Sequence, residues 1–252
     1  MQNGAYGKCS TTRMRISLSR GKENLMTQTD KNMDEEKEYY SLTKKVFDIL
    51  APFYDTIAGP LSRLRETVVD FTGAEKGSQI LDVATGTGKQ AFAYAKRGYD
   101  VVGIDLSEGM VKVANRKNRY KNAKFQVADA TSLPFDENSF NVVSASFALH
   151  TMPPTIRRKV MKEMARVTKR AGTMVIVDFA LPLNKPGKCL VYNMVRVPMG
   201  KHFVEFTHSD LEGLLKESGI ETREERRAIL GGVRILRGIK GGLAYKGRDG
   251  RI

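Results

Sequence analysis

The chain has 252 residues, of which 41% are hydrophobic, so it can bury one sizeable core but is short for two domains of ordinary size. Its two cysteines, Cys9 and Cys189, stand far apart, which argues against a disulfide framework and a cysteine-based zinc site, and we expect no bound metal. No apolar run reaches the roughly 18 residues of a membrane-spanning helix. These features predict a soluble, cytoplasmic protein.

The formal net charge of +14 is concentrated at the ends of the chain. Residues 1–32 carry six Lys or Arg and two acids, and residues 233–252 carry six and one. Basic tails can touch an anionic membrane surface or simply keep a protein dissolved, and residues 1–22 also have the composition of an organelle-targeting peptide. We interpret residues 1–32 as a disordered leader and residues 240–252 as a tail, and we expect nucleic acid not to be the partner.

Two helices are predicted ahead of the first strand. Apolar residues recur at helical spacing from Glu36 to about Leu50, and Pro52 ends the run. A second helix is predicted over residues 61–71, after Gly59 and Pro60. These helices form an N-terminal section, residues 33–77.

From residue 78 onward, short apolar runs alternate with stretches long enough for helices. This alternation predicts a parallel sheet with helices on both faces. The predicted strands are residues 79–84, 101–104, 124–128, 141–146 and 173–179, and the predicted helices are residues 89–97, 107–118 and 154–168.

The C-terminal part departs from this alternation. Residues 181–206 form an insertion broken by prolines, which we expect to act as a lid, and a helix follows at 209–217. Extended runs at 221–230 and 233–238 flank two glycines, which predicts an antiparallel hairpin. The predicted fold is therefore a doubly wound, Rossmann-like α/β fold: a seven-stranded sheet, mostly parallel, with a C-terminal antiparallel hairpin and added N-terminal helices. The main domain covers residues 78–239.

The strongest local signal is the stretch from Ile80 to Gly88, a buried strand that runs into a glycine-rich turn. Gly86 and Gly88 let the backbone approach a ligand closely. Asp105 ends the next strand, where its carboxylate can accept hydrogen bonds from both ribose hydroxyls. The pattern predicts a site for a nucleoside-containing cofactor.

Two cofactors fit this pattern. Gly86, Gly88 and Ala91 also match the G-x-G-x-x-A fingerprint of dinucleotides, so an NAD-dependent oxidoreductase stays open. Three features favour S-adenosylmethionine. They are the position of Asp82, four residues before Gly86, the helices ahead of the first strand, and the terminal hairpin.

From Val46 to Gly238 the chain resembles the ubiquinone/menaquinone biosynthesis C-methyltransferases, which are class I S-adenosylmethionine-dependent methyltransferases. The resemblance is carried by the entry helix from Val46 to Asp55, the loop from Leu81 to Gly88, the turn from Gly103 to Met110, and Ala128 to Ala130 with Leu133 to Phe135. The closing stretch from Leu230 to Gly238 is also similar to that family's hairpin.

The resemblance implies a cofactor site. Gly86 and Gly88 would line the methionine part, Asp105 would hold the ribose, Met110 would pack on adenine and Asp129 would meet its amino group, with Tyr54 as a cover. The full set of expected cofactor-binding residues is Tyr54, Asp82, Ala84, Thr85, Gly86, Thr87, Gly88, Asp105, Leu106, Met110, Asp129, Ala130 and Ser146.

The expected reaction is methyl transfer to a small apolar or amphiphilic acceptor such as a quinol, a phenol or a lipid. His150, after the fourth strand, is the candidate general base, because ligands bind beyond the carboxyl ends of parallel strands, and Tyr54 is the second candidate catalytic residue. Methylation of RNA or protein through the basic tails and non-catalytic regulation by S-adenosylmethionine binding are alternatives. The oligomeric state stays open.

Overall fold

The computed structural model describes residues 28–57, 61–182, 202–203 and 205–241. Its centre is one seven-stranded sheet with the order β3-β2-β1-β4-β5-β7-β6. Neighbouring strands are parallel from β3 to β5, and β7 is antiparallel to both of its neighbours. The strands are β1 (Gln79–Val83), β2 (Asp100–Asp105), β3 (Ala123–Val127), β4 (Phe140–Ser146), β5 (Thr168–Phe179), β6 (Ile220–Ala228) and β7 (Val233–Lys240). The predicted doubly wound sheet with a terminal hairpin is confirmed.

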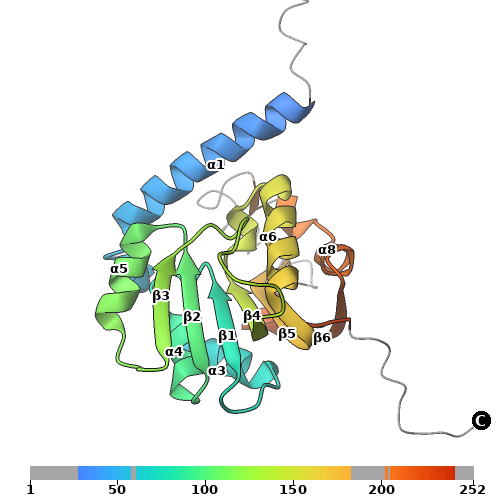
Figure 1. Cartoon of the computed structure of the whole chain (residues 1–252). Helices are drawn as coiled ribbons and strands as arrows, with labels where there is room; N and C mark the ends of the chain where they lie inside the picture. The colour runs from blue at the N-terminus through green and yellow to red at the C-terminus, as the bar shows by residue number, and fades with distance from the viewer. Residues whose placement is uncertain (1–27, 58–60, 183–201, 204, 242–252) are drawn as a thin grey trace, which may run out of the picture.

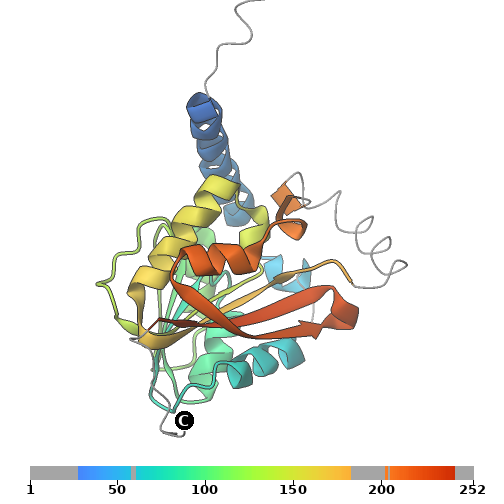
Figure 2. The same ribbon diagram turned by 90° about the vertical axis from the view of Figure 1, so that its right-hand side faces the viewer.

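Helices cover both faces of the sheet and create two separate cores. On one face, α3 (Ser62–Phe71), α4 (Lys89–Lys96) and α5 (Glu108–Lys117) pack on apolar strand residues. On the other face, α6 (Pro154–Val167) and α8 (Leu211–Glu217) close the second core and lie side by side (Figure 2). Both faces are therefore covered, as expected for strands that read as continuous apolar runs.

The helices predicted from residues 107 and 154 begin at residues whose own chemistry favours a helix start. The Ser107 side chain accepts a hydrogen bond from the Met110 amide at 3.0 Å and so caps α5. Pro154 occupies the first turn of α6, where its missing amide hydrogen costs nothing.

The N-terminal helices cross the carboxyl ends of the strands. Helix α1 (Gln28–Leu50) lies beyond the arrowheads of β1, β2 and β3, with its C-terminal end against α5 (Figure 1). Short helix α2 (Tyr54–Ile57) follows it. Asp48 of α1 fastens the two helices, because its Oδ1 accepts hydrogen bonds from the Ser107 hydroxyl at 2.5 Å and the Gly109 amide at 2.9 Å.

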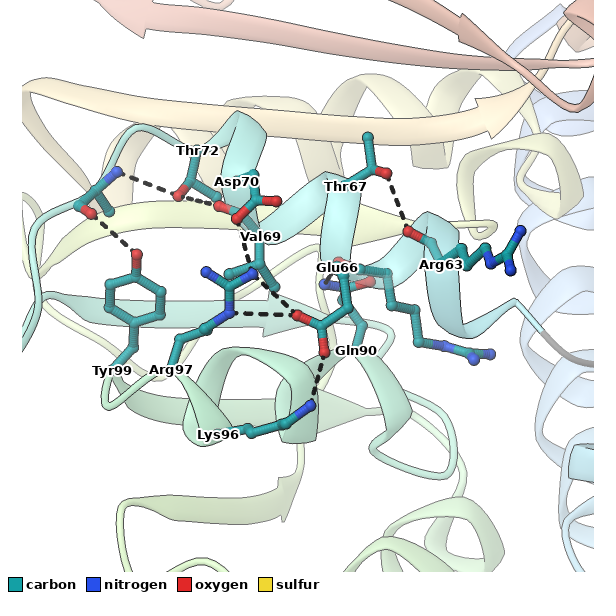
Figure 3. A network of polar contacts seen from close by, with 12 residues as sticks. Arg63, Glu66, Thr67, Val69, Asp70, Thr72, Gln90, Lys96, Arg97 and Tyr99 are labelled. Atoms are coloured by element: carbon teal, nitrogen blue, oxygen red, sulfur yellow. Dashed lines mark hydrogen bonds and ion pairs between the residues drawn. The ribbon is translucent and has the colours of Figure 1, made fainter.

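Helix α3 is tied to α4 by a surface network of charged groups (Figure 3). Glu66 binds both Lys96 and Arg97, at 3.2 Å each, and Arg97 also reaches Asp70 at 2.9 Å. Tyr99 adds a hydrogen bond from its hydroxyl to the Ala74 carbonyl at 2.9 Å. The N-terminal section is thus anchored to the sheet domain at two places.

The structure moves two expected boundaries. Helix α1 begins at Gln28, so the last five residues of the expected leader, 28–32, belong to the helix. Asp30 stands in its first turn, where an acid is favoured by the helix dipole. Strand β7 includes Lys240, which was expected to begin the tail. The Lys240 ammonium donates to the carbonyls of Arg166 and Thr168 at 3.1 and 2.7 Å, so it belongs to the fold. Most of the expected leader, tail and lid lie outside the described residues.

Within the described part of the chain, none of the helices has the length and apolar character needed to cross a membrane.

Replacing Asp48 with Ala is expected to lower the free energy of unfolding by about 1–2 kcal/mol, because two donors on α5 lose their acceptor. The hydrogen bond from Ser107 also lowers the pKa of Asp48. The stabilisation is therefore complete above the ordinary carboxyl pKa of about 4 and disappears as the pH falls through the lowered value. Urea unfolding at neutral and acidic pH measures both effects. Asp34→Ala, an exposed acid on the same helix, is the control; equal losses in both variants would contradict the role given to Asp48.

Candidate functional site

The glycine-rich loop after β1 is held in a conformation that ordinary side chains resist. Ala84, Gly86 and Gly88 have φ values of 54°, 57° and 83°, in the left-handed region. A Cβ atom on Gly88 would stand 2.9 Å from the Phe92 ring and 3.0 Å from the Phe125 ring, so glycine is required there. Gly88 is also the residue before α4, so the loop leads directly into a helix N-terminus.

Asp105, the last residue of β2, is fixed by two backbone amides. Its Oδ2 accepts from the Gly86 amide at 2.8 Å, and its Oδ1 accepts from the Ser107 amide at 2.9 Å. Burial raises the pKa of Asp105, and the two amide donors oppose that shift. Each oxygen keeps a second lone pair, so the carboxylate can still accept two ligand hydroxyls.

Asp82 has a different role from Asp105, because its side chain is closed in beneath the loop. It is 1% exposed and accepts from the Thr85 hydroxyl at 2.6 Å and from the Ser144 hydroxyl on β4 at 3.0 Å. Burial raises its pKa to about 6, against the hydrogen bonds from Thr85 and Ser144. Asp82 therefore supports the loop from below and links β1 to β4.

Tyr54 of α2 lies next to Gly86 of the glycine-rich loop. Its ring comes within 4.0 Å of the position that a Cβ on Gly86 would take, and it meets Phe47 edge-on at 6.1 Å. Burial, and after it Asp105, raises the pKa of the Tyr54 hydroxyl. The neighbouring Asp55 holds this helix in place.

Asp55 joins α2 to the loop and to α5 through three contacts. It accepts from the Thr87 hydroxyl at 2.5 Å and from the Lys117 ammonium at 2.6 Å, and it pairs with Lys89 at 3.4 Å. The predicted cofactor residue Thr87 is thus 3% exposed and engaged by the covering helix. The sequence pattern did not identify Asp55 as this link.

Asp129 follows β3 in the same way that Asp105 ends β2. Its Oδ1 accepts from the Thr131 amide and hydroxyl, both at 2.8 Å, and the Thr131 hydroxyl also contacts the Tyr40 hydroxyl at 2.9 Å. Tyr39 packs edge-on against Tyr40 at 5.5 Å, and burial raises its pKa, with Asp105 and Asp129 adding to the shift. Tyr39 and Tyr40 thus reach the site from α1. The sequence pattern gave neither of them a role there.

His150 and Asp178 form a buried pair across the ends of β4 and β5. They are 4% and 2% exposed, and the His150 Nδ1 lies 2.7 Å from the Asp178 Oδ1. The His150 amide also donates to the Asp178 Oδ2 at 3.2 Å. This contact assigns the ring proton to Nδ1, which leaves Nε2 as a proton acceptor.

Aromatic rings surround His150. Phe179 lies 4.8 Å from its ring, and Phe203 and Phe206 lie 6.1 and 6.4 Å away. Arg157 of α6 secures the turn that carries His150, because it donates to the carbonyls of Leu149 and Met152 at 3.2 and 2.9 Å. The pair is therefore surrounded mainly by aromatic rings, and the turn that carries His150 is tied to α6 through Arg157.

The predicted site residues fall into two groups. Asp82, Thr85, Thr87, Gly88 and Met110 are buried and support the loop and α5. The half-buried group can meet a ligand; it consists of Tyr54, Ala84, Gly86, Asp105, Leu106, Asp129, Ala130 and Ser146. Met110, predicted to pack on adenine, is 1% exposed and packs with Ala51 and Val113.

Comparison with known proteins identifies the family. Residues 80–172 match the family model described as a methyltransferase domain. The chain is 43% identical to a demethylmenaquinone methyltransferase of Renibacterium salmoninarum over 146 residues, which cover 56% of this chain and 60% of that protein. The chain thus spans about three fifths of the length of this relative.

Two further similarities extend over more of the chain. A demethylmenaquinone methyltransferase of Staphylococcus carnosus is 31% identical over 198 residues, covering 73% of this chain and 81% of that protein. The solved structure of magnesium protoporphyrin IX methyltransferase from Synechocystis PCC 6803 with bound S-adenosylhomocysteine has a TM-score of 0.59 and 20% identity, covering 71% of this chain and 83% of that chain, so it shares the fold. The chain therefore belongs to the ubiquinone and menaquinone C-methyltransferase family of class I, S-adenosylmethionine-dependent methyltransferases.

Proposed function

We propose that this protein transfers a methyl group from S-adenosylmethionine to a small apolar or amphiphilic acceptor of the quinol or phenol type. The observation that carries the proposal is the separation of two kinds of group along the same edge of the sheet. Carboxylates suited to an adenosine follow β2 and β3, and a histidine base among phenylalanine rings follows β4. Ligands of open α/β sheets bind along this edge.

The residues at the ends of β1, β2 and β3 fit the cofactor. Asp105 can accept the ribose hydroxyls, Asp129 can accept from the adenine amino group, and the backbone around Gly86 leaves room for the methionine part beneath Tyr54. S-Adenosylmethionine supplies a methyl carbon that is already activated by its sulfonium. The chain's main task is then to hold the acceptor in line and to exclude water.

The residues that follow β4 and β5 fit an apolar acceptor that must lose a proton. Phe179, Phe203 and Phe206 present apolar surface around His150. Asp178 fixes the His150 ring, so that the proton given up by a carbon or hydroxyl of the acceptor can pass to Nε2. In this proposal His150 is the general base, Asp178 orients it and Tyr54 covers the cofactor.

The relatives support the substrate class, because they are named as demethylmenaquinone methyltransferases, that is, for a quinone acceptor. Family membership does not favour the NAD-dependent alternative. The RNA alternative depended on basic tails, most of whose residues lie outside the described part of the chain. We also propose a cytoplasmic location, supported by a chain with only two cysteines, too few for a disulfide framework.

Binding of S-adenosylhomocysteine tests the cofactor end. Asp105→Asn replaces one acceptor oxygen with a donor that faces a backbone amide, so affinity measured by calorimetry is expected to fall about 10- to 100-fold. Asp100→Asn, at the exposed opposite end of β2, is the matched control and should bind as the parent protein does. Equal affinity in both variants would show that the ribose is held by other residues.

Methyl transfer to a panel of quinols, phenols and lipids tests the acceptor end. His150→Gln is expected to reduce turnover by about 10²- to 10⁴-fold, the usual contribution of a general base, while S-adenosylhomocysteine affinity stays within about twofold. Asp178→Asn should lower turnover in the same direction, because it no longer selects the tautomer with a free Nε2. His208→Gln, an exposed histidine, is the control.

Two results would contradict the proposal. Full turnover in His150→Gln would remove the base from the mechanism. Methylation of an RNA pool with no product from any small molecule would overturn the substrate class, even if the cofactor binds as expected.

A further inference from the structure

One arginine of the terminal hairpin differs from the others in having no acid partner. Each of the other arginines of β6 and β7 pairs with a glutamate of the hairpin; the pairs are Arg223–Glu221, Arg226–Glu224, Arg227–Glu225 and Arg237–Glu224. Arg234 makes no ion pair or hydrogen bond with any residue that the structure describes. Its Nε is buried, and a buried donor without an acceptor costs free energy.

The strand register places Arg234 beside the His150–Asp178 pair. Val233 and Ile235 lie in the core that packs against α3, α4 and α5. Because side chains alternate along a strand, Arg234 between them points to the opposite face, which α6 and α8 cover (Figure 2). Arg234 stands directly opposite Asp178 of β5, and such side chains share a face with their Cβ atoms about 4.5–5.5 Å apart. Arg234 therefore lies at the edge of the sheet where β5 ends, on the face that carries Asp178.

The charged groups next to Arg234 do not compensate it. Both oxygens of Asp178 accept hydrogen bonds from His150, and neither accepts one from Arg234. On the other side, Arg234 faces Arg227 of β6, and like charges directly opposite each other are unfavourable. The acid partner of Arg227 is Glu225, at 2.7 Å. A negative group placed beside Arg234 would thus meet a cation whose charge is not yet paired.

The other arginine near the His150 turn is not available to a ligand. Arg157 is 3% exposed and lies over the Phe206 ring at 4.9 Å. Its guanidinium donates to the carbonyls of Leu149 and Met152. Arg234, in contrast, is half-buried and has donors left for a ligand.

We propose that Arg234 binds an anionic oxygen of the acceptor, a carboxylate or a phenolate, beside the His150–Asp178 pair. The inference rests on the proposed function, because it names a chemical class of acceptor for the same site. The arginine fork matches both oxygens of a carboxylate and can also donate to a single phenolate oxygen. A phenolic hydroxyl that gives its proton to the His150 Nε2 becomes such an anion, and a cation beside it stabilises the negative oxygen among aromatic rings.

The distribution of charge along the edge of the sheet suits this class of acceptor. The carboxylates of Asp105 and Asp129 stand where the cofactor is proposed to bind, and its sulfonium is positive. The unpaired Arg234 stands at the far side of His150, beyond β5. Complementary charges of this kind decide which ligand binds at which end of a site.

Calorimetry with two small diphenols tests the carboxylate form of the proposal. Gentisate and hydroquinone differ by one carboxylate, and each is titrated into the full chain with and without S-adenosylhomocysteine. The parent protein should bind gentisate more tightly than hydroquinone. Arg234→Gln should weaken gentisate binding about 10- to 100-fold, the range for a hydrogen bond to a charged group, and leave hydroquinone within about twofold. Arg234→Lys keeps the charge without the fork and should recover part of the loss.

The colour of para-nitrophenol, whose anion absorbs visible light, tests the phenolate form. The pKa of the bound phenol should be lower than its value in water, because Arg234 stabilises the anion, and it should rise toward that value in Arg234→Gln. A carboxylate site changes the gentisate affinity alone, whereas a phenolate site changes the pKa of bound para-nitrophenol.

Arg223→Gln is the matched control, because it removes the same charge from an exposed residue of the same hairpin. It should leave the affinity for gentisate and the pKa of bound para-nitrophenol as they are in the parent. A cooperative urea transition in each variant shows that it is folded.

Three outcomes would overturn the inference. In the first, the parent binds neither anion, or Arg234→Gln changes neither the gentisate affinity nor the pKa of bound para-nitrophenol, so that Arg234 is only a solvated cation. In the second, Arg223→Gln weakens gentisate binding as much as Arg234→Gln does, which would be a general effect of net charge. The third is methyl transfer that proceeds equally in the parent and in Arg234→Gln for every acceptor; it would leave the proposed function standing and remove this inference alone.

Discussion

The Asp105 carboxylate is the constraint on which the rest of the site depends. Even partial burial makes a carboxylate costly to ionise unless it accepts hydrogen bonds, and for the half-buried Asp105 the amides of Gly86 and Ser107 supply them. This one side chain therefore fixes the loop after β1 and the turn before α5. Ser107 in turn caps α5 and donates to Asp48, so the position of α1 follows from the same centre. Loop, cap and covering helix form one connected set of hydrogen bonds.

The elements of the fold could be predicted from the sequence because their patterns are local. Parallel strands buried on both faces read as apolar runs, and residues such as Ser107 and Pro154 mark helix starts by their own chemistry. The element boundaries at Gln28 and Lys240 could not be predicted as well. Lys240 belongs to the sheet because of carbonyl groups far away in the chain, and nothing in the neighbouring residues indicates that contact.

The site was predictable to the extent that its residues follow strands. Gly86, Asp105, Asp129 and His150 could be found because the carboxyl ends of parallel strands meet at one edge. Asp178 was missed, although an acid that interrupts the apolar run from Met174 is a signal for a buried carboxylate with a partner. Tyr39 and Asp55 were not recognised as site residues, because their roles depend on how α1 and α2 cross the sheet.

The sheet has an unusual relation between the order of its strands in the chain and in space. Strand β7 follows β6 in sequence but lies between β5 and β6, with hydrogen bonds to both. During synthesis, β1 to β6 leave the ribosome before the strand that must separate two of them. Until β7 emerges, β5 presents an open edge, which is a template for pairing with other chains. A chain in which β7 has not yet paired therefore leaves the β5 edge open, and the sheet closes only when the last strand in the chain takes its interior place.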